Sequence, residues 1–439
     1  MTTTARQAAL DSLVPAAEAI LADADPRCDH GRYAATGRHR SLEDSIQDAW
    51  NLRAVSGVSR VADITGLDRL GIPVFNTYRT TAAPGNLTVT CGKGRTRKAA
   101  LASALMEAHE RYCGEQQGRQ GPVLTVARAR ERFAEVLDPR ELVLDTRTGW
   151  EPDAPLEWIP TRDLVSGAVV QVPADAVFSP YQAHGARLFA NHSDGLASGN
   201  CLAEATLHAL YELVERDGRS FGEVLRLGHQ VDLDSLPPDL RRLARTFEEA
   251  GISLSLFAFR SSLEITSFFA LGDDRLAENP MLVNAGAGCH LNPLVGVSRA
   301  LTELAQSRLS VISGAREDFS TRYRDRREET YQAAHERAAR WSHGWQRISF
   351  DEIPDHSAGD LGTDLETVCR SLRGAGLPRI LVADLTLADP AGPRSRGSVD
   401  DALPRVVKVI VPGLEFAANE PSRVGSRFYR FYKQARGAR

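Results

Sequence analysis

The chain has 439 residues, of which 42% are hydrophobic and 25% are charged. This length predicts two or three substructures, and the composition is typical of a folded globular protein rather than a disordered chain or a small disulfide scaffold. The formal net charge of -4 argues against a protein held on nucleic acid by non-specific phosphate contacts, so no nucleic-acid partner is expected.

The cysteine spacing and the hydropathy pattern indicate in which cellular compartment the protein is expected. The six cysteines are widely spaced, with no C-x-x-C pair, so neither a zinc ribbon nor a disulfide framework is expected. The first residues lack a signal-peptide pattern, and no apolar run approaches the roughly 18 residues that a membrane span needs. We therefore expect a cytoplasmic protein with no membrane partner.

The first hundred residues predict an appendage followed by mixed helices and strands. Residues 1–36 hold one Ala/Leu-rich helical stretch, 8–24, and a connector, which we interpret as an N-terminal appendage to a catalytic unit of residues 37–439. A helix is expected to start at Ser41, because Ser41 and Asp44 form a variant of the capping box. Residues 57–94 alternate β-branched and turn residues, which predicts strands and hairpins.

Further along, long helices alternate with strand-rich segments. Helices are expected at 96–117, 202–219 and 295–313, with strands at 155–191 and 252–271. Core motifs then occupy residues 37–313, and residues 314–439 form a C-terminal α/β portion. Within it, 321–343 is expected to be a solvated helix, and apolar runs in 375–411 are split by a Pro/Gly/Ser-rich loop. These patterns alone predict an α/β fold and nothing finer.

Three of the predicted helices align polar residues on one face. Because successive residues are about 100° apart on a helix, residues three or four positions apart share a side. The aligned residues are Ser103, Glu107, Glu110 and Arg111 on the first helix, Glu204, His208, Glu212, Glu215 and Arg216 on the second, and Arg299, Glu303 and Gln306 on the third. On one helix such residues would be ordinary surface ion pairs. Three such helices, each after a glycine-bearing turn at 92–94, 195–200 or 286–288, weaken that interpretation.

Several carboxylates can converge only if cations neutralise them, and hard oxygen ligands suit Mg²⁺. Backbone amides at a strand-to-helix corner suit a phosphate group. Neither the P-loop pattern G-x-x-x-x-G-K-[ST] nor the dinucleotide pattern G-x-G-x-x-G is present. The residues themselves therefore predict an unusual phosphate and magnesium site.

Four segments, in this order, are similar to motifs of the YcaO family: residues 37–45, 92–111, 195–217 and 286–308. The resemblance covers most of residues 37–313. It implies a YcaO-type fold of mixed, largely antiparallel sheets with long helices lining a central ATP/Mg²⁺ cleft. It also implies an enzyme that uses ATP to O-phosphorylate a backbone amide of a ribosomally synthesised peptide, giving an azoline by cyclodehydration, an amidine or a thioamide.

By position, the resemblance also implies the roles of individual residues. The implied Mg²⁺ ligands are Glu107, Glu110, Glu212 and Glu215. The implied ATP contacts are Arg38, Ser45, Asn200, Glu204, Arg216, Arg299 and Glu303. No catalytic residue is named in this way. Arg38 stands where the family commonly has Lys, and Ala197 stands where some members have Ser.

Partners are expected from the same resemblance. The sequence ends without the Pro-rich tail of many azoline-forming members, and residues 1–36 are too short for a fused E1-like or peptide-recognition domain. We expect an enzyme that modifies a precursor peptide alone or with an E1-like or TfuA-type partner protein, and the family is compatible with a homodimer. The alternative is a non-catalytic docking protein that presents a precursor peptide to a partner enzyme.

Three other features have competing interpretations. Residues 218–222 match the hydrolase pattern G-x-S-x-G but follow a helix, whereas a nucleophile elbow follows a strand. His109 and Cys113 lie one helical turn apart, yet two ligands do not make a zinc site, so a buried structural pair is expected. The aromatic segment 428–432 is expected to dock on the chain's own core rather than on a peptide or a second subunit.

Overall fold

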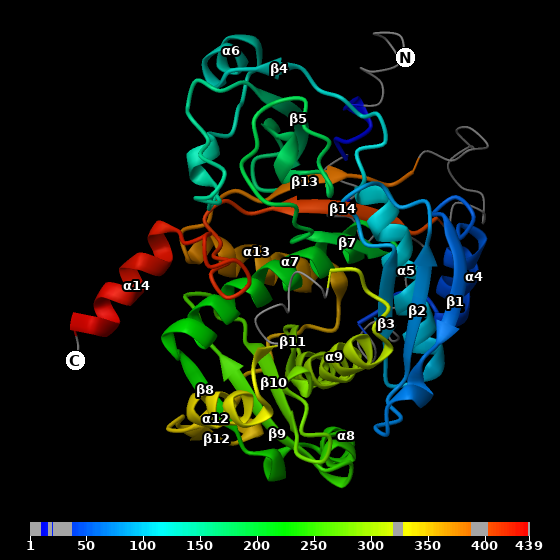
Figure 1. The fold of residues 1–439 in the computed structure, drawn as a ribbon. Coiled ribbons are helices and arrows are strands. Elements are labelled where there is room, and N and C mark those ends of the chain that lie inside the picture. Colours follow the sequence, from blue (N-terminus) through cyan, green and yellow to red (C-terminus); the bar gives the residue numbers. More distant parts are fainter. Residues whose placement is uncertain (1–9, 16–19, 21–36, 319–327, 388–402, 438–439) are drawn as a thin grey trace.

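The computed structural model describes residues 10–15, 20, 37–318, 328–387 and 403–437 (Figure 1). In this part of the chain the strands form three sheets whose ladders are antiparallel, apart from one short parallel pairing. The expected α/β fold with largely antiparallel sheets is therefore confirmed. Most of the predicted N-terminal appendage, including most of the helix at 8–24, lies outside the described residues.

The first sheet is a meander built from the segment predicted to hold hairpins. Its strands are β1 (Val58–Asp63), β2 (Val74–Arg79) and β3 (Val89–Lys93), paired in sequence order. Helix α4 (Leu42–Asn51) precedes it and packs on α5 (Arg97–Gly114), which follows it. The Ser41 side chain accepts a hydrogen bond of 3.0 Å from the Asp44 amide, so the predicted cap is confirmed.

The second sheet joins strands that are distant in the sequence. Its order is β4-β5-β13-β14-β7, with β6 paired to β5. The bounds are β4 (Val123–Leu124), β5 (Leu156–Asp163), β6 (Val169–Pro173), β7 (Leu196–Gly199), β13 (Leu381–Asp384) and β14 (Arg405–Ile410). The two C-terminal strands thus lie between β5 and β7. Helix α6 (Val126–Arg132) packs on β4, and helix α13 (Leu361–Gly374) packs on α7 (Leu202–Arg219).

The expected strands in 155–191 end at Pro173, and the residues beyond it form a loop. Asp175 explains how this loop stays buried without sheet pairing. Its carboxylate accepts hydrogen bonds from the amides of Leu188 at 2.7 Å and Phe189 at 3.0 Å. These two amides therefore have a partner that a neighbouring strand would otherwise supply.

The third sheet has the order β11-β10-β9-β8-β12. Its strands are β8 (Gly228–Val231), β9 (Ile252–Phe259), β10 (Ser267–Asp274), β11 (Val283–Cys289) and β12 (Arg347–Ile348); the nearby helices are α8 (Pro238–Glu249), α9 (Pro293–Ser313) and α12 (Tyr331–Ser342). The expected helix over 321–343 is found as α12, while residues 319–327 lie outside the described part. Among the described residues, no helix has both the length and the apolar character needed to span a membrane.

The three sheets meet around three long helices. Strands β3, β7 and β11 each lie at one end of their sheet, and each leads directly into a long helix, α5, α7 or α9. Helix α9 contacts both β11 and β3, and α7 contacts β7, β14 and β11. Figure 1 shows the sheets on three sides, with α7 and α9 between them.

Glycines allow each strand to touch its own helix. A Cβ on Gly92 would lie 1.9 Å from the Ala104 nitrogen, and one on Gly286 would lie 2.1 Å from the Leu304 nitrogen. On Gly199 the corresponding distance to the Ala205 nitrogen is 2.4 Å. These glycines are therefore explained by close strand–helix packing, which the expectation of phosphate-binding glycine turns had not considered.

Candidate functional site

Helix α7 gathers two carboxylates around one guanidinium. Arg216 NH1 lies 2.5 Å from Glu215 Oε1, and Arg216 NH2 lies 3.1 Å from Glu212 Oε1. Burial raises the pKa of Glu212 to about 7, although the charge of Arg216 lowers it. Burial also raises the pKa of Glu215. One guanidinium thus leaves these two carboxylates short of positive charge.

Helix α5 brings the other predicted pair of glutamates to the same region. Glu110 accepts hydrogen bonds from the Ser198 amide at 2.8 Å and the Ser198 hydroxyl at 3.0 Å, which ties α5 to β7. Burial, and then the charges of Glu107 and Glu212, raise the pKa of Glu110 to about 8. Glu107 itself lies 3.5 Å from Arg111. The glutamates of α5 and α7 therefore interact electrostatically in one region.

Helix α9 adds a carboxylate that is fully compensated. The Lys93 ammonium of β3 donates to Glu303, and the Ala287 amide donates to Glu303 Oε1 at 3.2 Å. Although burial opposes ionisation, the charges of Lys93 and Arg216 lower the pKa of Glu303 to about 2. Glu303 is thus ionised at neutral pH and already paired.

A histidine connects α9 with α7. Arg299 NH2 lies 2.5 Å from His208 Nε2, and His208 Nδ1 lies 3.3 Å from the Ser198 carbonyl oxygen. Burial and the charges of Arg299 and Arg38 hold the pKa of His208 well below its ordinary value. The imidazole is therefore neutral, and Nε2 accepts the hydrogen bond from Arg299.

The N-terminal motif packs against the start of α7. Arg38 NH1 donates to Glu204 Oε1 at 2.7 Å, and the Asn200 amide donates to both Glu204 oxygens at 3.0 and 3.1 Å. Ser45 Oγ donates to Asn200 Oδ1 at 2.8 Å. The Ser45–Asn200 and Arg38–Glu204 contacts join residues that are 155 and 166 positions apart in the sequence.

Contacts or shared charge interactions thus link all of the residues for which the resemblance implies a Mg²⁺ or ATP role. The linked residues are Arg38, Ser45, Glu107, Glu110, Asn200, Glu204, Glu212, Glu215, Arg216, Arg299 and Glu303. Their assignment to Mg²⁺ or to the nucleotide remains a prediction.

Sequence reasoning missed four side chains at the same junction. They are Lys93, Asp194, Ser198 and Lys408. Lys93 and Lys408 are two of only four lysines in the chain, and Lys408 interrupts the apolar strand β14. A buried lysine in such a strand is the signal that could have identified it. Burial lowers its pKa to about 8, against the opposing charges of Asp194 and Glu212.

The donor chemistry fits Mg²⁺. Within the described ranges, no group of three or more His, Cys, Asp or Glu side chains is arranged to hold a metal ion by itself. Each Mg²⁺ ion bound together with a triphosphate takes one or two protein carboxylates, and phosphate oxygens and water fill its other positions, so four glutamates would suit more than one ion. Carboxylates raised in pKa on α5 and α7 offer such oxygen ligands.

The competing motifs are structural. Ser220 continues α7 into a short π-helical turn (Ser220–Val224), and its hydroxyl donates to the Arg216 carbonyl at 2.9 Å, so it forms no nucleophile elbow. His109 is buried between the Cys113 sulfur at 3.5 Å and the Ser56 hydroxyl at 2.9 Å.

The C-terminal aromatic segment lies on α14 (Ser426–Gly437). The Phe428 and Phe431 rings lie 5.8 and 5.0 Å from the Phe221 ring. Arg427 pairs with Asp217 at 2.6 Å. The expectation that this segment docks on the chain's own core is confirmed for Phe428, Phe431 and Tyr432, whereas Tyr429 is exposed.

Comparison with known proteins agrees with this geometry. A family model described as YcaO cyclodehydratase, ATP- and Mg²⁺-binding, matches residues 91–415. An uncharacterised protein of Methanothermobacter thermautotrophicus is 39% identical over 381 residues, covering 84% of this chain and 93% of that protein. A protein from the tfuA 3′ region of Rhizobium leguminosarum bv. trifolii is 32% identical over 374 residues, covering 82% and 84% respectively.

Solved structures show the same fold. YcaO from Methanopyrus kandleri, bound with AMPPCP and Mg²⁺, superposes with a TM-score of 0.70 at 24% identity, covering 89% of this chain and 95% of that one. A heterocyclase in complex with substrate and cofactor gives a TM-score of 0.69 at 23% identity, covering 86% of this chain and 53% of the heterocyclase. The predicted fold is therefore confirmed, and the family description confirms the predicted cofactors, ATP and Mg²⁺.

Proposed function

This chain belongs to the YcaO family, and we propose that it activates a backbone amide of a ribosomally synthesised peptide by ATP-dependent O-phosphorylation. The product is an azoline, an amidine or a thioamide. The observation that carries this proposal is the cluster of largely buried glutamates on α5 and α7, where Glu212 and Glu215 share one guanidinium and burial raises the pKa values of Glu110, Glu212 and Glu215.

The chemistry follows from the weakness of an amide as an electrophile. A nucleophile adds to the amide carbon, the resulting oxyanion takes the γ-phosphoryl group of ATP, and the carbon–oxygen bond breaks as phosphate departs. ADP is released when the phosphoryl group is transferred, and the amide oxygen leaves in the phosphate. For an azoline or an amidine, one proton of the nucleophile and one N–H proton pass to solvent; for a thioamide, both protons come from the sulfide and the amide nitrogen keeps its own. A Cys, Ser or Thr side chain gives an azoline, a peptide amine gives an amidine, and external sulfide gives a thioamide.

The residues of this chain supply position and charge. Phosphoryl transfer depends mainly on alignment and on neutralising the charge of the phosphates, so it needs no protein nucleophile. Glu107, Glu110, Glu212 and Glu215 would hold Mg²⁺ through carboxylate oxygens. Arg38, Ser45, Asn200, Glu204, Arg216, Arg299 and Glu303 would hold and orient the nucleotide. The neutral His208 fixes Arg299 within this set.

A partner protein is part of the proposal. One relative is encoded in the tfuA 3′ region of its genome, which supports a TfuA-type protein as the partner that assists modification of the precursor peptide. Incubation with and without such a protein is therefore included in the assay below.

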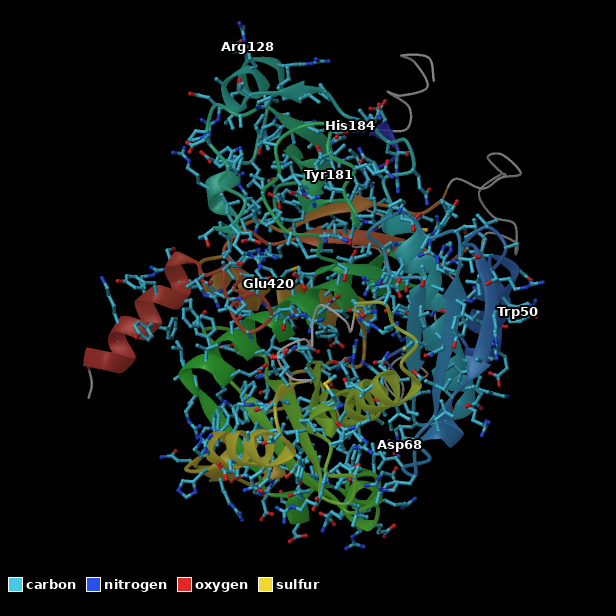
Figure 2. All side chains as sticks on the ribbon, viewed as in Figure 1. Trp50, Asp68, Arg128, Tyr181, His184 and Glu420 are labelled. Carbon is cyan, nitrogen blue, oxygen red and sulfur yellow. The ribbon has the colours of Figure 1, made fainter. Side chains whose placement is uncertain are left out.

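The test begins with binding of AMPPCP in the presence and absence of Mg²⁺, measured by calorimetry. Glu107→Gln and Glu212→Gln should each weaken Mg²⁺-dependent binding at least about 10-fold, because changing even a residue that supports a metal ligand typically costs about 10–100-fold in affinity. Glu131→Gln is the matched control, because Glu131 pairs with Arg128 at the surface of α6, away from the junction (Figure 2).

Turnover is followed with the peptide encoded beside the gene, MgATP and sulfide, with and without a TfuA-type protein, by intact mass and phosphate release. Loss of one water indicates an azoline or amidine, and exchange of oxygen for sulfur indicates a thioamide. Full activity in both glutamine variants would refute the proposal. Absence of Mg²⁺-dependent nucleotide binding in the wild-type chain would favour the docking alternative instead.

A further inference from the structure

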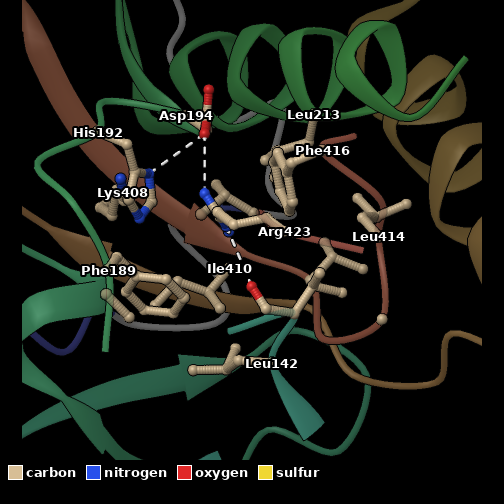
Figure 3. Close-up of a pocket in the computed structure, with 15 residues that line it drawn as sticks. Leu142, Phe189, His192, Asp194, Leu213, Lys408, Ile410, Leu414, Phe416 and Arg423 are labelled. Atoms are coloured by element: carbon tan, nitrogen blue, oxygen red, sulfur yellow. Dashed lines mark hydrogen bonds and ion pairs between the residues drawn. The ribbon is translucent and has the colours of Figure 1, made fainter. Parts of the chain in front are cut away.

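Asp194 lies immediately behind the candidate site and contacts three cationic or titratable side chains. Its carboxylate is 3.5 Å from Arg216 Nε, 3.3 Å from Arg423 NH1 and 3.3 Å from His192 Nδ1. Figure 3 shows Asp194 between α7 and the strand that carries Lys408, with interactions to His192 and Arg423. Only 12% of its side chain is exposed, so these interactions are poorly screened by solvent.

Arg423 is a rigid anchor for this carboxylate. Its Nε donates to the Val143 carbonyl oxygen at 3.0 Å, and its side chain is 5% exposed. The guanidinium lies 4.0 Å from the Phe416 ring centroid and 4.7 Å from the Phe189 ring centroid. A guanidinium held between two rings and a carbonyl loses little further freedom when it binds a carboxylate.

The space around Asp194 and Arg423 is too small for a nucleotide. The cavity that their side chains line has a volume of about 30 Å³ and is otherwise walled mainly by apolar residues of β14, of α7 and of neighbouring loops (Figure 3). A cavity of this size holds about one or two water molecules. The charged groups therefore act on each other and on α7, and the cavity is not a ligand site.

We propose that Asp194, anchored by Arg423, is a positioning residue that holds Arg216 against Glu212 and Glu215. This inference rests on the proposed function. NH1 and NH2 of Arg216 face the two glutamates, and Nε lies 3.5 Å from Asp194 Oδ1, an ion-pair contact without a hydrogen bond. The fixed carboxylate attracts the guanidinium from this side. It therefore keeps the planar group from shifting toward bound phosphates or rotating away from α7.

The ionised state of Asp194 supports this role. Burial acts to raise the pKa of Asp194, but His192, Arg216 and Arg423 together lower it below its ordinary value. The carboxylate is therefore charged at neutral pH. Arg423, in the segment after β14, is thus linked to Arg216 through two ion pairs that share Asp194.

The test compares Asp194→Asn, which preserves shape and removes the charge, with Asp68→Asn. Asp68 forms a buried pair with Arg308 at 2.9 Å, away from the candidate site (Figure 2). For each variant, Mg²⁺-dependent binding of AMPPCP, KM for ATP, kcat and urea unfolding are measured. We expect Asp194→Asn to weaken AMPPCP binding and raise KM at least about tenfold, and Asp68→Asn to lower stability while affinity stays within about twofold of wild type.

A second variant, Arg423→Lys, tests the same inference if Asp194→Asn does not fold. Arg423→Lys keeps the charge but gives up the Nε donor to the Val143 carbonyl, so we expect an effect in the same direction but smaller. Because both residues act through one ion pair, we expect no additional loss of affinity when it is combined with Asp194→Asn. The inference is overturned if Asp194→Asn, or Arg423→Lys where the former does not fold, loses stability but binds nucleotide like wild type. If the wild-type chain binds no AMPPCP with Mg²⁺, the proposed function has failed, a result distinct from failure of Asp194 alone.

Discussion

Removal of the Arg216 charge is the most informative perturbation of the metal-free site. Arg216 contacts Glu215 at 2.5 Å, Glu212 at 3.1 Å and Asp194 at 3.5 Å. Arg216→Gln would leave three largely buried carboxylates without this shared cation, although Asp194 keeps its pair with Arg423. Removing one partner of a buried ion pair typically costs about 3–5 kcal/mol, and we expect a loss of this size in the free energy of unfolding at pH 8 without Mg²⁺.

The loss should depend on pH with a definite sign. Glu212 already has a pKa of about 7 in the folded chain, above the ordinary value of 4.5, and removal of Arg216 raises it further. A group with a raised folded pKa regains stability as pH falls through that pKa, because the folded state takes up the proton first. Between pH 8 and pH 6 the deficit of Arg216→Gln relative to wild type should shrink by about 1–2 kcal/mol.

Urea unfolding followed by circular dichroism, with EDTA or with saturating Mg²⁺, measures both effects. Mg²⁺ should restore part of the lost stability, because it supplies positive charge to the same carboxylates. Arg128→Gln is the control: its ion pair with Glu131 is 72% and 64% exposed, so its loss should cost less than about 1 kcal/mol. Equal free energies of unfolding for the two variants at pH 8 would contradict the charge balance described above. So would a stability loss of Arg216→Gln, relative to wild type, that does not change with pH.

Two further predictions concern the scaffold. Gly92→Ala should lower the free energy of unfolding by about 3 kcal/mol or more and reduce nucleotide affinity, because a Cβ 1.9 Å from the Ala104 nitrogen must push α5 away from β3. The control, Gly66→Ala, should be nearly neutral, because its Cβ would meet nothing within 4 Å. Equal urea midpoints for the two variants would contradict this prediction. Burial lowers the pKa of His109 to about 4, so the unfolded chain binds this proton at a higher pH than the folded chain does. The free energy of unfolding should therefore fall by up to about 3 kcal/mol between pH 6.5 and pH 4, and by less in His109→Gln. Parallel pH profiles for wild type and variant would disprove this prediction.

Local signals in the sequence predicted the elements that carry the site. Helix α7 runs from Leu202 to Arg219, the same bounds as the expected helix, because its polar and apolar residues repeat with the helical period. The cap at Ser41 depends on a contact three residues away. The two α5 glutamates were likewise predictable, since residues on one helical face are neighbours whatever the rest of the chain does.

Contacts that depend on sheet topology could not be predicted in this way. Lys93 meets Glu303 across 210 positions, and Asp194 meets Arg423 across 229. Lys408 reaches the site only because β14 lies between β13 and β7. No local pattern encodes these neighbours, and a glycine before a helix is ambiguous, because phosphate binding and strand–helix packing both require a residue without Cβ.

The charge distribution divides the junction into two sides with different chemical capacities. On the side of β3 and α9, Lys93 pairs with Glu303, whose pKa falls to about 2, so this carboxylate has little to gain from another cation. On the side of α5 and α7, Glu110 and Glu212 have pKa values of about 8 and about 7, which means that burial and mutual repulsion exceed the compensation by nearby arginines. A dication lowers the free energy of the second side most. This difference supports the proposed roles of Glu110, Glu212 and Glu215 as Mg²⁺ ligands and of Glu303 as a nucleotide contact.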